Sequence, residues 1–150
     1  ESLSAVSAPI QYAAVEAFSS DHSDYLNKTR NILSSVGNYV YDKLKSNKVL
    51  ITPPQGGFYL MPEFLNSKFE TSQQMCDDIL NKTGVALLPG SDFGFKENRM
   101  LARLSYTDFD GDLLLRNIHG SKKLDNDFIK KNVPNIVEGT NKLVEWSKSL

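Results

Sequence analysis

Hydrophobic residues recur every three or four positions at both ends of the chain, which is the spacing of amphipathic helices. Near the start, Ser7 followed by Pro9 is a helix-start signal, and a longer helix is expected over residues 23–46. Further periodic segments cover residues 124–133 and 134–148. The first helix should present an apolar face made of Ile10, Ala13, Ala14, Ala17 and Phe18.

The middle of the chain instead contains short apolar runs bounded by Gly and Pro, which are typical of strands. We expect four strands, over residues 49–52, 57–61, 85–88 and 100–105. The first two should form a hairpin around the turn at 53–56, and Thr71 with Gln74 predicts the capped start of a helix. Short connections favour antiparallel pairing. The predicted fold class is therefore α+β, with a small antiparallel or mixed sheet of about four strands covered by helices.

Length and composition are those of one globular domain spanning residues 1–150. A chain of this length buries roughly 70% of its unfolded surface, which is enough for a single core. Hydrophobic residues make up 40% and charged residues 23%, and the net charge is −1 without a basic stretch. Nucleic-acid and anionic-membrane partners are therefore not supported. No apolar run reaches the ~18 residues of a membrane span.

The residues that most often form metal or nucleophilic sites are sparse. Cys76 is the single cysteine, which excludes an intrachain disulfide and suits a reducing, cytoplasmic compartment. It lies on the apolar side of a predicted helix, so we interpret it as a core residue. His22 and His119 lack partners at metal-ligand spacing, and the alternating aspartates at 108–112 lack the glycine and glutamate of a calcium loop. We predict no metal site.

Arg103 lies inside the apolar run at 100–106 and needs an anion or water, because a guanidinium buried alone would cost several kcal/mol. Strand alternation places Leu104 and Tyr106 on the face opposite Arg103. Arg103 then either lies along an edge strand with its head in water or points into a cleft to bind an anion. Spacing alone favours the solvated arrangement.

Four segments, in this order, carry a resemblance to a known family: Gln11-Tyr12-Ala13-Ala14 after the Ser-x-Pro helix start, Pro54-Gln55-Gly56-Gly57-Phe58-Tyr59, Gly84 to Gly94 with the pattern G-V-x-x-x-P-G-x-x-F-G, and Arg103-Leu104-Ser105-Tyr106. Together they resemble the C-terminal small domain of class I/II pyridoxal-phosphate aminotransferases of fold type I. Residues 124–125 and the helix at 134–150 match the family's usual ending, so the resemblance covers nearly the whole chain. The resemblance therefore favours the anion-binding arrangement of Arg103.

The resemblance implies a substrate site and partners. Arg103 would bind the α-carboxylate of an amino acid or 2-oxo acid, and Gly56 and Gly57 would let the backbone approach it. Phe58 and Tyr59 would line the site, or else belong to the sheet core. The implied cofactor is pyridoxal 5'-phosphate, and the implied partners are the large domain of the same protein and a second subunit in a homodimer.

One part of the family pattern is missing from this chain. The Schiff-base lysine lies in an S-x-x-K or S-x-S-K segment followed by G-x-R-x-G, and the Ser-Lys pairs at 67–68, 121–122 and 147–148 are not followed by it. We therefore predict no catalytic residue here, and no activity or specific cofactor binding for this chain alone. The chain also starts without a leader, which suggests a cut into a longer protein.

Two points of function stay open. Leu3 stands about where dicarboxylate-specific members carry a second Arg, so an aspartate-like substrate is not supported. The alternative to an enzyme is an aminotransferase-like effector-binding or interaction module without catalysis, for example in a transcription regulator. A Schiff-base lysine segment or a DNA-binding motif upstream in the native gene would decide between these two.

Overall fold

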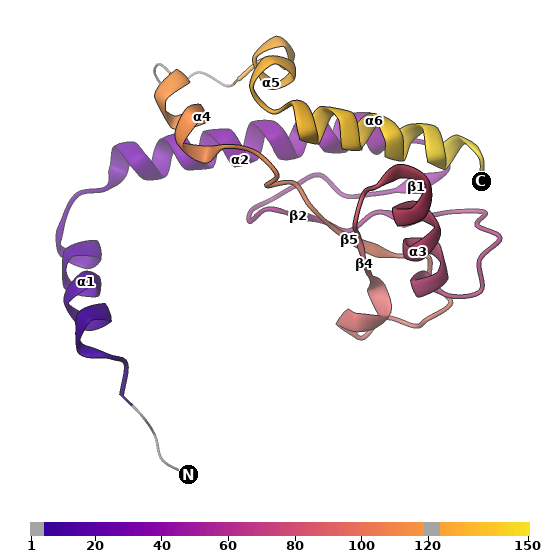
Figure 1. Ribbon diagram of the computed structural model, residues 1–150, viewed down its shortest axis with the longest axis horizontal. Coiled ribbons are helices and arrows are strands. Elements are labelled where there is room, and N and C mark those ends of the chain that lie inside the picture. Colours follow the sequence, from indigo (N-terminus) through magenta and orange to yellow (C-terminus); the bar gives the residue numbers. More distant parts are fainter. Residues whose placement is uncertain (1–4, 119–123) are drawn as a thin grey trace.

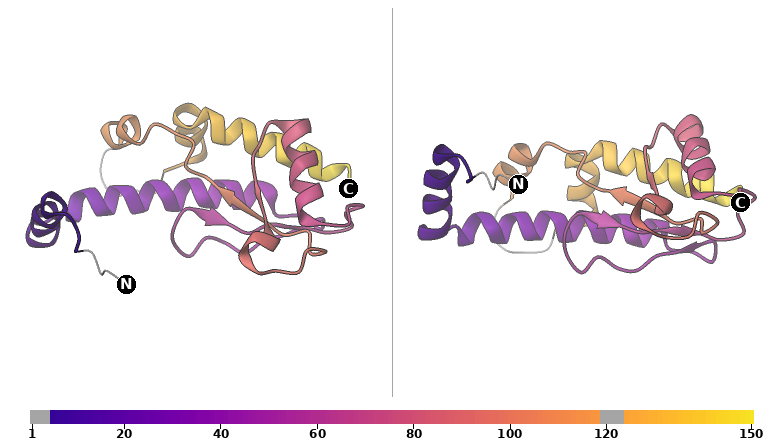
Figure 2. Two further views of the ribbon diagram at one scale, coloured as in Figure 1. Left: turned by 60° about the horizontal axis from the view of Figure 1, so that its bottom comes forward. Right: turned by 90° about the horizontal axis from the view of Figure 1, so that it is seen from below.

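The computed structural model describes residues 5–118 and 124–150. In chain order its elements are α1 (Ala8–Ser19), α2 (Ser23–Leu44), β1 (Val49–Leu50), β2 (Tyr59–Leu60), β3 (Glu63–Phe64), α3 (Ser72–Thr83), β4 (Leu88–Pro89), the 3-10 helix η1 (Gly90–Phe93), β5 (Ala102–Ser105), α4 (Gly111–Asn117), α5 (Asn126–Asn132) and α6 (Pro134–Lys148). Helix α2 runs alongside α6, and the strands and α3 lie together near the C-terminal ends of both helices (Figure 1). Helix α1 extends away from this body, as both further views also show (Figure 2).

The strands form two small antiparallel sheets. One pairs β1 with β3, and the other has the order β2-β5-β4. An isolated bridge between Glu63 and Leu101 links them. The predicted α+β mixture with antiparallel pairing is confirmed, but the single four-stranded sheet and the hairpin of its first two strands are wrong. Pro53 and Pro54 cannot donate to a strand ladder, so the chain passes through 51–55 without pairing.

Local capping explains where the helices begin. Ser7 precedes α1, which has a proline in its first turn as predicted. Thr71 accepts a hydrogen bond from the amide of Gln74 at 3.2 Å, so the predicted cap of α3 is confirmed. Helix α4 was not predicted. It is only seven residues long and opens with Gly111, and its start is capped by Asp110.

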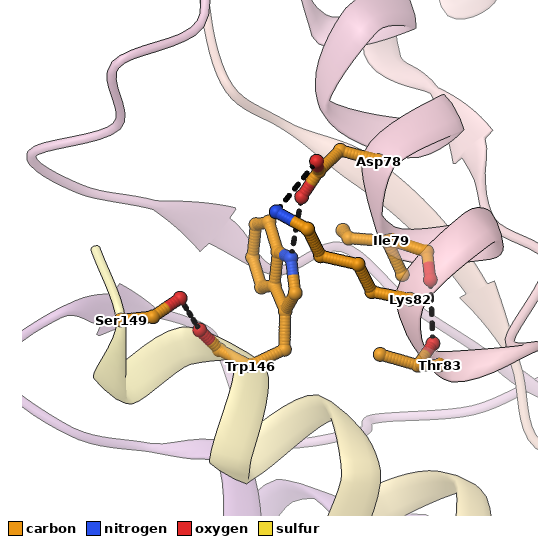
Figure 3. A network of polar contacts seen from close by, with 6 residues as sticks. All are labelled: Asp78, Ile79, Lys82, Thr83, Trp146 and Ser149. Carbon is orange, nitrogen blue, oxygen red and sulfur yellow. Dashed lines mark hydrogen bonds and ion pairs between the residues drawn. The ribbon is translucent and has the colours of Figure 1, made fainter.

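The core is enclosed by the helices α2 to α6 and the strands. Cys76 is buried within it, and burial raises the pKa of its thiol to about 12. This agrees with its interpretation as a core residue. Trp146 joins α6 to α3, because its indole N–H donates to Asp78 at 2.8 Å while Lys82 pairs with the same carboxylate at 2.8 Å (Figure 3). The Phe64 ring meets the indole edge-on at 5.2 Å between centroids.

Helix α1 is the exception to this packing, since none of its residues is buried. The helix is present as predicted, but its apolar face is open to solvent, with Phe18 91% exposed. Ile10 on this face is also exposed, as are Val6, Tyr12 and Val15 elsewhere along the segment. In the described part of the chain, no helix is both long enough and apolar enough to cross a membrane.

Candidate functional site

Strand β5 determines the direction in which Arg103 points. Ala102, Leu104 and Tyr106 are buried, whereas Arg103 between them is half-buried. The predicted alternation is confirmed for these residues. Strand β5 is the central strand of its sheet, and Arg103 in β5 is paired with Leu88 of β4. Arg103 is therefore not an edge-strand residue.

The guanidinium of Arg103 lies between two aromatic rings. Its Cζ is 4.3 Å from the centroid of Tyr59 and 4.2 Å from that of Phe93, distances at which a cation is attracted to a ring face. Within residues 5–118 and 124–150, no carboxylate lies within 4.0 Å of this guanidinium. The charge of Arg103 is therefore held by rings and is not neutralised by an acidic partner of the described chain.

Phe93 ends the 3-10 helix η1, whose first residue is hydrogen-bonded to the residue before β5. The Gly90 amide donates to the Leu101 carbonyl at 2.7 Å, and a Cβ at Gly90 would lie 2.9 Å from that same oxygen. Gly94 ends η1 with a φ of +81°, which favours glycine. Sequence reasoning did not assign Phe93 to the site, although the Pro-Gly-x-x-Phe-Gly segment that contains it was the available signal.

The loop before β2 and the first residue of that strand carry the other predicted site residues. Gly57 has a φ of +66°, and its carbonyl accepts a hydrogen bond from the Tyr106 hydroxyl at 3.0 Å. The rings of Phe58 and Tyr59 are 4.3 Å apart and are 39% and 40% exposed, so neither residue belongs to the core. Tyr59 contacts Arg103 directly, whereas Phe58 reaches it only through Tyr59.

Tyr106 supports this loop from the buried face of β5. Burial raises the pKa of its phenol, so the hydroxyl stays protonated and can donate to Gly57. Gly37 of α2 gives the ring its space, since a Cβ there would lie 2.8 Å from Tyr106 Cζ. A hollow of about 440 Å³ is lined by Leu104, Ser105 and Tyr106, and Arg103 is not among its lining residues.

The lysines and possible metal ligands of the described chain bear on whether it can hold a cofactor. None of the described lysines is buried, and the exposed Lys148 pairs with Glu145 at 2.6 Å. Lys68 is also exposed. No three metal-ligating side chains converge anywhere in this part of the chain. Leu3, His119 and the Ser-Lys pair at 121–122 lie outside the described residues.

Comparison with known proteins places the chain in a family. The family model described as aminotransferase class I and II matches residues 1–113. An aspartate aminotransferase from a Bacillus species is 33% identical over 89 residues, which cover 56% of this chain and 22% of the relative. A Bacillus subtilis protein named probable N-acetyl-LL-diaminopimelate aminotransferase is 35% identical over 91 residues, which cover 61% of this chain and 23% of the relative. The chain belongs to the class I and II aminotransferases.

Solved structures share this fold. The alanine aminotransferase from Pyrococcus furiosus superposes with a TM-score of 0.70 at 20% identity, covering 95% of this chain and 30% of its own. An aspartate aminotransferase from Thermotoga maritima superposes with a TM-score of 0.64 at 22% identity, and the match covers 97% of this chain and 30% of the other. The chain thus spans about a quarter to a third of the length of the relatives it matches.

Proposed function

We propose that residues 1–150 are the C-terminal small domain of a pyridoxal-phosphate-dependent aminotransferase, which transfers an amino group between an amino acid and a 2-oxo acid. Arg103 binds the α-carboxylate of the substrate. The observation that carries this proposal is the position of Arg103 between Tyr59 and Phe93, with no carboxylate of the described chain beside it.

A guanidinium suits this task because it is planar and always charged. It binds a carboxylate through two parallel charge-assisted hydrogen bonds, which fix the orientation of the ligand as well as its position. Amino acids and 2-oxo acids both carry this carboxylate, so one arginine serves both half-reactions. Orientation of the substrate Cα towards the reacting group is part of the catalytic contribution.

The cofactor supplies an electron sink when it is bound, and class I and II aminotransferases generally use pyridoxal phosphate. None of the described lysines is buried, and we assign the cofactor to no side chain of this chain. Here the proposal is limited to substrate binding by Arg103 and its neighbours. Gly57, Phe58 and Tyr59 form the adjacent surface.

The exposed face of α1 belongs to the same proposal. Its apolar side chains, including Ile10 and Phe18, would be covered by the large domain of the enzyme and by a second subunit of a homodimer. The coverage of the relatives supports this, because the matched chains are several times longer than the matched segment.

Two experiments on the 1–150 chain test this arrangement. Sedimentation should show concentration-dependent self-association of the wild-type chain. Phe18→Asp should reduce this association. Asp24→Asn, a change at an exposed polar residue, is the control and should leave it unchanged. A strictly monomeric wild-type chain would point to a self-contained module. Titration with pyridoxal phosphate should give only slow, scattered lysine modification, whereas a saturable one-to-one absorbance change would contradict the assignment.

Kinetics of the complete enzyme test the role of Arg103. Arg103→Lys keeps the charge but loses the planar fork, so binding should weaken by roughly 1.5–3 kcal/mol and turnover should also fall. Arg103→Ala should lose more, with amino acids and 2-oxo acids affected together. The decarboxylated amine of the same amino acid serves as control, and its slow reaction should barely change. Unchanged amino-acid kinetics in Arg103→Ala would exclude the carboxylate role.

A second candidate function is an effector-binding or interaction module without catalysis. It is favoured by one observation, that none of the described lysines is buried. In that case Arg103 would bind the carboxylate of an effector. The native gene's upstream sequence separates the two, since a Schiff-base lysine segment supports the enzyme and a DNA-binding motif supports the regulator.

A further inference from the structure

Two rings from different parts of the chain lie against the Arg103 guanidinium. Tyr59 comes from β2 and Phe93 from η1, with their centroids 4.3 Å and 4.2 Å from Cζ. The two rings are only partly covered themselves, at 40% and 37% exposure. Neither ring is a core residue, so neither position is explained by burial alone.

An arginine side chain has many rotamers, so contacts with neighbouring groups must restrict its conformation if it is to orient a ligand. Arg99 shows the usual solution, because its Nε and Nη2 donate to the two oxygens of Glu63 at 2.9 and 2.6 Å. Arg103 has no such carboxylate within the described chain. The contacts that hold it are the two rings.

A carboxylate from the chain itself would occupy the donors of the guanidinium and compete with a ligand. Rings attract the cation through their faces and leave its N–H groups unused, since those groups lie in the guanidinium plane. A ring over each face of the guanidinium would leave its edge open for a ligand. A planar carboxylate in the same plane fits that approach through two parallel hydrogen bonds.

We propose that Tyr59 and Phe93 are positioning residues that hold the plane of Arg103, so that the substrate carboxylate binds edge-on in one orientation. This inference rests on the proposed function of Arg103. It adds that the precision of carboxylate binding comes from the two rings, and that Phe93 is part of the substrate site.

The backbone around both rings is held in place before any ligand binds. Tyr59 is paired with Ser105 two residues along β5 from Arg103, so its register relative to the guanidinium is set. Phe93 ends η1, and the first residue of η1 is fixed by the hydrogen bond from the Gly90 amide to the Leu101 carbonyl. The backbone that carries each ring is therefore fixed by hydrogen bonds to β5 or to the residue before it, and this preorganises the site.

The test is a double-mutant cycle in the complete enzyme between Phe93→Leu and Arg103→Ala, with kcat/KM measured for an amino acid and for its decarboxylated amine. Phe93→Leu should lower kcat/KM for the amino acid about three- to tenfold, the range of a cation–π contact, and leave the amine unchanged. In the Arg103→Ala background the same change should have no further effect. Phe93→Tyr keeps a ring and should restore wild-type values.

Phe95→Leu is the matched control, because Phe95 is 39% exposed and its ring lies 5.4 Å from Arg99 Cζ, in contact with the other arginine. It should leave both substrates unaffected. Suppose that Arg103→Ala lowers kcat/KM for the amino acid, but Phe93→Leu either has no effect or lowers kcat/KM equally in the wild-type and Arg103→Ala backgrounds. The positioning inference is then overturned, while the carboxylate role of Arg103 stands. If Arg103→Ala itself has no effect, the proposed function fails, and the inference fails with it.

Discussion

Arg99 and Arg103 lie four residues apart, yet the chain treats their charges in opposite ways. Arg99 binds Glu63 through two hydrogen bonds, and its guanidinium lies over Phe95. Arg103 is held between two rings and has no carboxylate partner in the part of the chain that the structure describes. The first charge is paired inside the fold, whereas the second has no acidic partner among the described residues.

The surroundings of the two arginines fit this difference. Glu63 belongs to β3 and bridges to Leu101, so the Arg99 pair lies where the two sheets meet. The Arg99 guanidinium holds the pKa of the Glu63 carboxyl below its usual range. Around Arg103 the neighbours are instead partly exposed aromatic residues. Position within the same short segment therefore separates a structural ion pair from a candidate binding group.

The largest stability effect is expected behind the Arg103 site. In Gly37→Ala the new Cβ would meet Tyr106 Cζ at 2.8 Å, so the ring or α2 must move. Overpacking of this kind costs about 1–3 kcal/mol. Urea unfolding of the 1–150 chain followed by the fluorescence of Trp146, its single tryptophan, measures the loss. The control Gly56→Ala has open space at its Cβ and should unfold close to wild type.

If Gly37→Ala were as stable as wild type, the close packing of Tyr106 against α2 would be refuted. The same variant sharpens the comparison of the two arginines. Displacing Tyr106 should disturb the Gly57 loop and the Tyr59 ring, and hence the Arg103 site. The Arg99–Glu63 pair, which has no contact with Tyr106, should persist.

A smaller effect is expected for Arg99→Ala, which leaves the Glu63 carboxylate without its partner in a side chain only 17% exposed. The variant should be less stable than wild type near neutral pH. Because the pKa of Glu63 is lowered in the fold, its contribution is present above the ordinary value of 4.5 and is lost as pH falls through the lowered value.

Wild type and Arg99→Ala should therefore approach each other in stability in acid, well below pH 4.5. Urea unfolding at several pH values tests this. Arg103→Ala is the comparison variant, and its difference from wild type should show no such convergence, because no described carboxylate is bound to Arg103. A constant gap for Arg99→Ala at all pH values would contradict the ion pair.

The smallest effect is expected for Tyr106→Phe, which removes the hydrogen bond to the Gly57 carbonyl and keeps the ring. Gly57 is exposed, so water can replace the lost donor and the cost should be only about 0.5 kcal/mol. Equilibrium unfolding of the same chain measures it. A loss as large as that of Gly37→Ala would mean that the hydroxyl, and not the space for the ring, positions the loop.

Much of the fold could be predicted from local signals. The starts of α1, α3 and α6 depend on caps and prolines within a few residues, and the inward direction of Leu104 and Tyr106 depends only on strand alternation. Helix α4 was missed because a seven-residue helix that opens with Gly111 has almost no periodic signal. Strand β3 has only two residues and was missed for the same reason.

The candidate site was predictable only in part. The motif segments pointed to Arg103, Gly57, Phe58 and Tyr59, and the structure places Tyr59 against Arg103. The contact with Phe93 depends on the closure of the chain between Gly90 and Leu101, which no local pattern encodes. The pairing of β2 with β5 across more than forty residues of sequence was likewise out of reach, since short segments do not specify distant partners.

The most direct test of the contrast between the arginines is the inhibition constant of phenylpropionate, a carboxylate without an amino group, on the complete enzyme. We predict that Arg103→Lys weakens inhibition at least tenfold, as expected for a lost charge-assisted hydrogen bond of roughly 1.5–3 kcal/mol, and that Arg99→Lys leaves it within about twofold of wild type. Equal inhibition constants for wild type and Arg103→Lys, or a larger loss in Arg99→Lys, would contradict the assignment of Arg103 as the carboxylate-binding residue.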